Sequence, residues 1–115
     1  MPKAYLIAFY SEVKDSDALA AYAKLAIPAT EADGGRMLAA GGRVKSLEGG
    51  IEERTVVIEF DDFETAVKHY DSDGYQEALR ALGDGVVRDM RVVWKCSNSV
   101  LRCDRRDLIV QTLSE

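Results

Sequence analysis

Arginines and glutamates gathered in one glycine-rich region could do the chemistry of anion binding. Arg36, Arg43 and Arg54 lie on or beside this region, and Glu48 and Glu59 come from it as well. Guanidinium groups bind carboxylates in a two-point geometry. Arg36 and Arg43 are therefore candidate ligand-binding residues, and the alternative is that the arginines pair with the glutamates on an exposed strand surface.

Glu59 and His69 are the weak candidates for moving a proton. Glu59 stands within the otherwise apolar run Arg54–Phe60, where burial would raise its pKa and allow it to act as a general base. His69 is the sole histidine, and a lone histidine is more typical of a protein surface. The chain shows no nucleophile elbow and no metal-ligand pair, so the sequence leaves open whether the protein is an enzyme.

Tyr70 and Tyr75 are the aromatic candidates for ligand binding. Both occupy apolar stripes at helical spacing, and Arg80 follows them. They could face a cleft between helices and sheet, because small-molecule sites combine apolar walls with a few polar groups. They could equally be core aromatics whose hydroxyls are satisfied.

Three glycine pairs within residues 34–50 suggest a phosphate-binding loop at first sight. Such a loop needs a glycine turn that leads from a strand into a helix. Here Gly34-Gly35 leads from a helix into a strand, and Gly41-Gly42 interrupts a strand as a bulge or bend. We therefore interpret the glycines as structural.

Hydrophobic spacing and cap residues predict six segments of regular structure, the last helical one broken in two. A strand over Ala4–Tyr10 is followed by a helix that begins near Asp15 and kinks or restarts at Pro28 before Gly34. The remaining predicted elements are a strand over Arg36–Ala40 prolonged by Val44–Leu47, a strand over Arg54–Phe60, helices begun by Asp61-Asp62 and by Ser72-Asp73, and a strand over Val86–Lys95.

This β-α-β-β-α-β order is the ferredoxin-like plan, an α+β fold with a four-stranded antiparallel sheet and the helices on one face. Alternation along the first strand puts apolar side chains on both faces of the sheet, with Tyr5, Ile7 and Phe9 opposite Leu6, Ala8 and Tyr10. Helices can cover only one of these faces. The sequence therefore predicts a homodimer packed sheet on sheet.

Several segments together match a known family. They are Gly34-Gly35-Arg36, Gly41-Gly42-Arg43-Val44, Leu47-Glu48-Gly49, Val57-Ile58-Glu59-Phe60 and the stretch from Ala66 through Tyr70, Ser72 and Tyr75 to Arg80. With these segments, residues 2–95 resemble the family catalogued as domain of unknown function 1330, within the dimeric α+β barrel superfamily. The resemblance implies a ferredoxin-like subunit whose sheet packs on that of a second subunit. It implies no activity, although the superfamily also contains cofactor-independent monooxygenases and isomerase-like enzymes.

We therefore expect residues 1–95 to form one domain that binds a small anionic or aromatic metabolite in a cleft between helices and sheet, with no metal or cofactor. The alternative is a cofactor-independent monooxygenase-like or isomerase-like enzyme. Residues 96–115 form an extension, either an additional strand over Asp107–Leu113 or a frayed tail.

Composition narrows the partners and the location. The net charge of −5 disfavours nucleic acid, and the basic stretch Arg88–Arg106 is interpreted as a solvated strand face and tail. No apolar run is long enough to cross a bilayer, which predicts no membrane association and a cytoplasmic protein. Cys96 and Cys103 match no zinc or redox spacing and are interpreted as free thiols.

Overall fold

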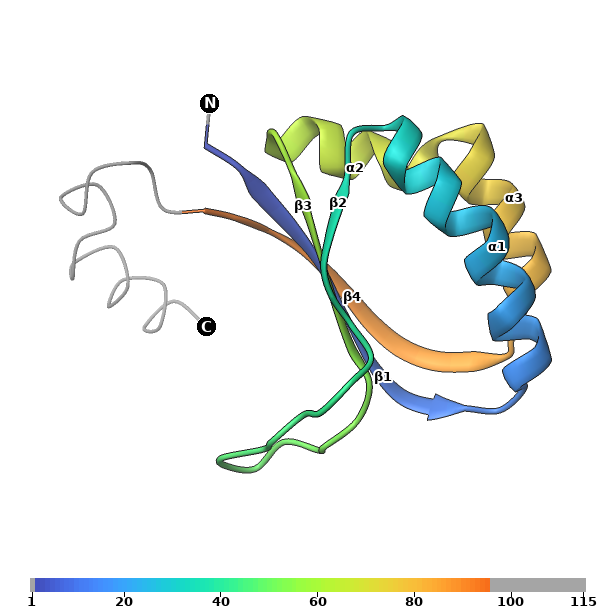
Figure 1. Ribbon diagram of the computed structural model, residues 1–115, viewed down its shortest axis with the longest axis vertical. Helices are drawn as coiled ribbons and strands as arrows, with labels where there is room; N and C mark the ends of the chain where they lie inside the picture. Colours follow the sequence, from blue (N-terminus) through green and yellow to red (C-terminus); the bar gives the residue numbers. More distant parts are fainter. Residues whose placement is uncertain (1, 96–115) are drawn as a thin grey trace, which may run out of the picture.

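A computed structural model describes residues 2–95, in which a twisted sheet carries all the helices on one of its faces (Figure 1). The seven elements are, in order, β1 (Ala4–Val13), α1 (Ser16–Ala32), β2 (Arg36–Ala40), β3 (Thr55–Phe60), α2 (Phe63–Asp71), α3 (Asp73–Leu82) and β4 (Val86–Trp94). The predicted order of elements is confirmed, with the second helical segment divided into α2 and α3.

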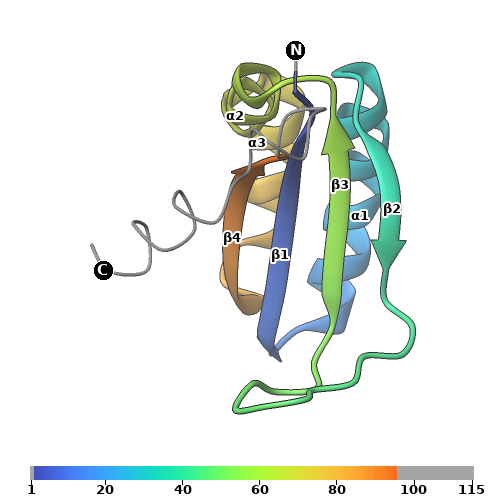
Figure 2. The same ribbon diagram turned by 90° about the vertical axis from the view of Figure 1, so that its left-hand side faces the viewer.

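The four strands form one antiparallel sheet in the order β2-β3-β1-β4 (Figure 2). This arrangement places the first strand between the third and the last, as the ferredoxin-like plan requires. The predicted fold class is therefore confirmed.

The alternation predicted for the first strand decides where the core lies. Leu6, Ala8 and Tyr10 of β1 are buried beneath the helices, together with Ile58 and Phe60 of β3. The side chains on the opposite face of the sheet have no helix over them, and they include Phe9, Val87 and Val93, which are all more than 40% exposed.

Side-chain caps start the helices at the predicted residues. The carboxylate of Asp15 accepts hydrogen bonds from the backbone N–H groups of Asp17 and Ala18, and Asp62 caps α2 in the same way. Pro28 was expected to kink or restart the first helix, but α1 runs from Ser16 to Ala32 with Pro28 inside it. Packing against the sheet and α3 supports the helix here more strongly than the local loss of one hydrogen bond disfavours it.

The segment between β2 and β3 differs most from the prediction. Residues 41–54 form no strand and project beyond the end of the sheet (Figures 1 and 2), so the prolongation of β2 over Val44–Leu47 was wrong. The bulge in β2 lies between Met37 and Ala39 rather than at the glycine pair. Gly41 and Gly42 instead end the strand with φ values of 78° and 77°, in the left-handed region that favours glycine.

The predicted strand over Asp107–Leu113 and the two cysteines lie outside the described residues. Within residues 2–95, no helix is long and apolar enough to cross a membrane.

Candidate functional site

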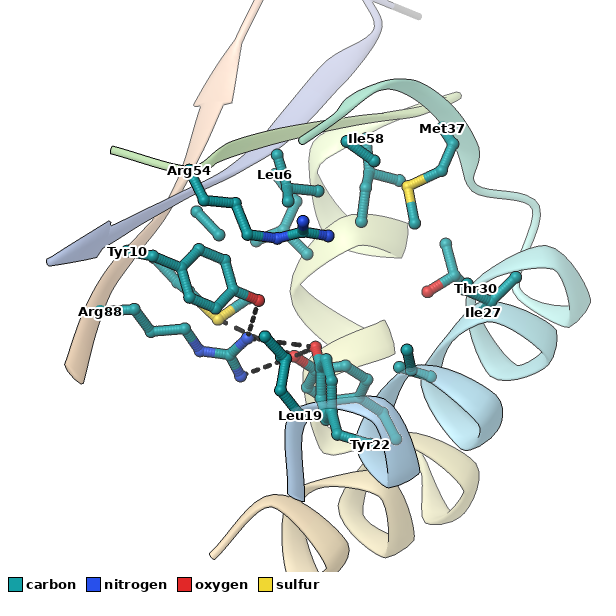
Figure 3. Close-up of a pocket in the computed structure, with 17 residues that line it drawn as sticks. Leu6, Tyr10, Leu19, Tyr22, Ile27, Thr30, Met37, Arg54, Ile58 and Arg88 are labelled. Atoms are coloured by element: carbon teal, nitrogen blue, oxygen red, sulfur yellow. Dashed lines mark hydrogen bonds between the residues drawn. The ribbon is translucent and has the colours of Figure 1, made fainter. Parts of the chain in front are cut away.

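A cavity of about 100 Å³ lies between α1 and the inner face of the sheet (Figure 3). Its apolar walls come from both layers and include Leu6, Leu19, Ile27, Met37, Val56 and Ile58. Ile27 and Met37 are 42% and 44% exposed, so the cavity opens to solvent between α1 and β2. An enclosed apolar cavity of roughly 150 Å³ holds one benzene molecule, so a ligand of that size or larger extends partly into this opening.

The polar end of the cavity is built around Arg88, which β4 directs toward the helices. One terminal nitrogen of Arg88 donates hydrogen bonds to the hydroxyls of Tyr10 at 2.9 Å and of Tyr22 at 3.2 Å. The other terminal nitrogen donates to the hydroxyl of Tyr75 at 3.2 Å. Three elements, β1, α1 and α3, thus each supply a phenol to a single guanidinium group.

The charge of Arg88 persists in this setting. Burial works to lower the pKa of Arg88, but the phenol oxygens of Tyr22 and Tyr75 outweigh burial, and the pKa is raised above its ordinary value. Burial also raises the pKa of Tyr75, with Tyr22 acting in the same direction and Arg88 in the opposite one. At neutral pH the site therefore contains a guanidinium cation surrounded by neutral phenols.

Of the three phenol hydroxyls, one can still donate a hydrogen bond to a ligand. The oxygens of Tyr22 and Tyr75 lie 2.5 Å apart and share one hydrogen, and Tyr75 can direct its own toward the sulfur of Met90 at 3.8 Å. The oxygen of Tyr10 accepts from Arg88, and no acceptor for its hydrogen occurs among the described residues. Tyr10 can thus donate to a ligand atom held next to Arg88.

A second guanidinium group, that of Arg54, also lines the cavity. In Figure 3 it extends from the start of β3 toward the cavity interior, with Tyr10 between it and Arg88. The guanidinium carbons of Arg54 and Arg88 lie 5.7 and 5.4 Å from the centroid of the Tyr10 ring. Within the described part of the chain, neither group forms an ion pair with a carboxylate.

Arg36 and Glu59 meet, but on the open face of the sheet and away from this cavity. The Nε of Arg36 donates to a carboxylate oxygen of Glu59 at 2.9 Å, and its Nη2 donates to Asp61 at 3.1 Å. The hydrogen bond from Arg36 lowers the pKa of Glu59 below its ordinary value. This environment is the opposite of the burial that a general base would need.

His69 is buried rather than on the surface, because two polar partners hold it between the helices. Its Nδ1 lies 2.6 Å from a carboxylate oxygen of Asp33, and its Nε2 lies 3.3 Å from the hydroxyl of Thr30. The imidazole is 1% exposed and packs on the rings of Phe60 and Tyr75. The expectation of a surface histidine was therefore wrong.

The remaining candidates lie in three different places. Tyr75 is buried at the cavity, whereas Tyr70 is 43% exposed and lines a neighbouring surface hollow that also reaches Arg88. Arg43 is exposed on the projecting segment. The structure thus does not bring Arg36, Arg43, Glu59 and His69 to one cavity. These four residues therefore do not form one catalytic site.

The central residue of the site, Arg88, was missed because it was grouped with a solvated basic stretch. The signal that could have found it is strand alternation: Arg88 has the same parity as Met90 and Val92, which the pattern puts on one face of the last strand. A charged residue on the helix-covered face of a strand is rare unless it has partners or a ligand. Tyr10 shares that inner face on β1.

The fold and the site define a small α+β protein of ferredoxin-like topology with a cavity lined by two guanidinium groups and three phenols. The chain belongs to the family described as "Domain of unknown function (DUF1330)", whose model matches residues 3–96. No match was found among curated proteins.

Solved structures share the fold at low sequence identity. A protein of unknown function from Rhodopseudomonas palustris is 16% identical over 82% of each chain, with a TM-score of 0.68. A "putative antibiotic biosynthesis monooxygenase" from Caulobacter crescentus is 13% identical over 80% of this chain and 88% of its own, with a TM-score of 0.52. A Nitrosomonas europaea protein of the same description is 12% identical over 86% of this chain and 96% of its own, with a TM-score of 0.51. These similarities show the fold alone.

Proposed function

We propose that the protein binds a small organic acid in the cavity between α1 and the sheet. The carboxylate of the ligand accepts hydrogen bonds from Arg88 and Tyr10, and its hydrocarbon part packs on the apolar walls. The observation that carries this proposal is the guanidinium of Arg88, which faces the cavity and, among residues 2–95, has only phenols as hydrogen-bond partners.

The guanidinium cation of Arg88 is partly removed from water and has no counterion among the described residues. A half-buried cation costs free energy unless it is paired, and three phenol oxygens solvate Arg88 without neutralising it. An anionic ligand would supply the missing charge. Hydrogen bonds in which one partner is ionised contribute about 1.5–3 kcal/mol each, which is enough to favour a carboxylate over a neutral ligand of the same shape.

The lining residues support binding rather than catalysis. Those that belong to the described part of the chain include two arginines and three tyrosines but no carboxylate and no imidazole. Abstraction of a proton from a ligand needs a base whose pKa lies near the working pH, and such a base must come within hydrogen-bond reach. The groups that touch the cavity directly can hold an anion but do not provide that base.

A matched pair of ligands and a matched pair of variants test the proposal. Ligand-detected NMR should show that benzoate binds and that the neutral benzamide does not. Arg88→Met should abolish benzoate binding, because it removes the cation that holds the carboxylate. It also removes three hydrogen bonds to phenols, so the melting temperature is measured to show that the variant is folded under the conditions of the binding experiment. Arg91→Met, on the same strand but paired with Asp89 on the other face, should bind benzoate normally. Equal binding of benzoate and benzamide, or retained binding in Arg88→Met, contradicts the proposal.

One contact makes an isomerase-like enzyme that needs no cofactor the second candidate. Thr30 lines the cavity, and its hydroxyl contacts the Nε2 of His69, whose Nδ1 contacts Asp33. A proton of the ligand could pass through the hydroxyl of Thr30 to His69. The test measures whether the carbon-bound protons of a bound acid exchange in D₂O. Exchange that His69→Phe abolishes, with the affinity for the acid retained, supports an enzyme. Absence of exchange in the wild type supports binding alone.

We also propose that two copies of the chain associate through the open face of the sheet. The apolar side chains on this face include Ile7, Phe9, Val57, Val87 and Val93, and no element of the described chain covers them. A monomer would leave this patch in water.

A further inference from the structure

We propose that the ligand carries two separate carboxylates, one held by Arg88 and Tyr10 and the other by Arg54. This inference rests on the proposed binding of an organic acid and specifies which acids the cavity selects. The observation behind this inference is the position of Arg54. In the sequence, Arg54 lies beside the glycine-rich region, and nothing there indicates that it lies near Arg88.

The backbone and a glycine hold Arg54 at the cavity. The N–H of Tyr10 donates to the carbonyl oxygen of Arg54 at 3.0 Å, which fixes the start of the arginine side chain beside the Tyr10 ring. A Cβ added at Gly41 would lie 2.9 Å from a terminal nitrogen of Arg54. The guanidinium of Arg54 thus lies close against the backbone at Gly41, where β2 ends.

The charge of the cavity lining favours a ligand with two negative charges. The lining that the described residues provide contains Arg54 and Arg88 and no acidic residue, so its formal charge is positive at both guanidinium groups. Arg54 is exposed, but within the described chain no carboxylate pairs with it. A monocarboxylate would neutralise Arg88 and leave Arg54 without a partner.

The geometry favours two anionic groups over one group that carries both charges. The two guanidinium groups lie on different sides of Tyr10 in Figure 3, each within 6 Å of the ring centroid. Arg88 already directs three hydrogen bonds at phenols, which limits the donors that it can offer to a single phosphate. A dicarboxylic acid on a short or aromatic carbon frame can reach both arginines while its hydrocarbon part contacts the apolar walls.

Calorimetry with the full-length protein tests the inference with ligands that share a benzene ring. The probes are benzoate, the three benzenedicarboxylates and phenyl phosphate. At least one dicarboxylate should bind the wild type roughly ten- to a hundredfold more tightly than benzoate, as expected for one added charge-assisted contact. Arg54→Gln should remove this preference, because it lowers the affinity for the dicarboxylate much more than the affinity for benzoate. Arg80→Gln, which removes an equal charge from the exposed face of α3, should retain the preference.

The outcomes separate this inference from the proposed function. If benzoate and every dicarboxylate bind equally, the ligand carries one carboxylate. If Arg54→Gln keeps the preference, a group other than Arg54 holds the second carboxylate. In both cases only the present inference fails. If phenyl phosphate binds more tightly than all the dicarboxylates, the site takes a single dianionic group and the inference also fails. If none of the probes binds, the proposed function itself fails. An unchanged melting temperature of Arg54→Gln shows that any loss comes from the site and not from unfolding.

Discussion

The hydroxyl oxygens of Tyr22 and Tyr75 lie 2.5 Å apart, although 53 residues separate them in the chain. Tyr22 comes from α1 and Tyr75 from α3, and their rings pack edge to face with centroids 5.9 Å apart. Both hydroxyls also accept from Arg88 of β4. The pair therefore joins two helices to the sheet at the point where the cavity is most polar.

The free energy of unfolding of Tyr75→Phe should fall less steeply at high pH than that of the wild type. Burial raises the pKa of Tyr75 above its ordinary value of 10.0, so the folded state retains a proton that the unfolded state releases. The stabilisation is fully present below about pH 10 and is lost as the pH rises above it, because the slope follows the difference in bound protons. Urea unfolding between pH 8 and pH 11 measures this slope.

The exposed Tyr70 supplies the control for this experiment. Tyr70→Phe makes the same substitution at a side chain that is 43% exposed, and the slope of Tyr75→Phe is compared with that of Tyr70→Phe. If Tyr75→Phe and the wild type lose stability in parallel above pH 10, the phenol of Tyr75 is not protected by the fold in the way described.

His69 and Asp33 should show strong energetic coupling. Asp33→Ala leaves the Nδ1 of a fully buried imidazole without a partner and should lower the free energy of unfolding by about 1–3 kcal/mol. His69→Phe keeps an aromatic ring against Phe60 and Tyr75, and in that background Asp33→Ala should cost almost nothing. A double-mutant cycle by urea unfolding measures the coupling. Additive effects of the two substitutions would mean that the 2.6 Å contact contributes little to stability.

The fold could be predicted because strand alternation, helical stripes and caps are local signals. Leu6, Ala8 and Tyr10 fall on the inner face of β1 as their spacing indicates. The site could be predicted only in part, because it depends on helix packing: nothing local says that Tyr22 and Tyr75 meet above Arg88. Tyr75 was singled out as an aromatic candidate for ligand binding and lines the cavity, but its contact with a ligand stays a prediction, and the residues that it contacts come from elements far apart in the chain.

The same reasoning explains why the arginines of the glycine-rich region were separated by the structure. Arg36 lies in β2 and Arg54 directly precedes the neighbouring strand β3, yet Arg36 faces the open side of the sheet with Glu59, while Arg54 extends to the cavity. The bulge between Met37 and Ala39 and the projecting segment 41–54 change the register between the strands. Sequence spacing alone does not fix which side of the sheet each arginine takes.

Gly35→Ala should destabilise the protein, because the backbone of Gly35 packs tightly where α1 leads into β2. A Cβ at this position would lie 2.5 Å from Cγ2 of Thr30 and 2.9 Å from the ring of Phe60, both of which are buried. We expect a loss of about 1–3 kcal/mol, as for other overpacked cores. Gly49→Ala, at a position with open space around it, should change stability by less than about 0.5 kcal/mol. Thermal unfolding of the two variants compares them, and equal melting temperatures would contradict the close packing at Gly35.

Val93→Glu should separate the proposed dimer into monomers. Val93 lies on the open face of the sheet beside Tyr5 and is 47% exposed, so a single copy tolerates a charge there. In a two-fold symmetric interface the substitution occurs twice, once in each copy. Each unpaired charge that the interface buries costs several kcal/mol. Sedimentation velocity at micromolar concentration should therefore show a dimer for the wild type and a monomer for Val93→Glu. Leu25→Glu adds the same charge on α1, where the apolar side chain is 41% exposed, and should remain a dimer. A monomeric wild type would show that the chain does not form the proposed dimer. A dimer that dissociates in Leu25→Glu and persists in Val93→Glu would show that the copies contact each other through another surface.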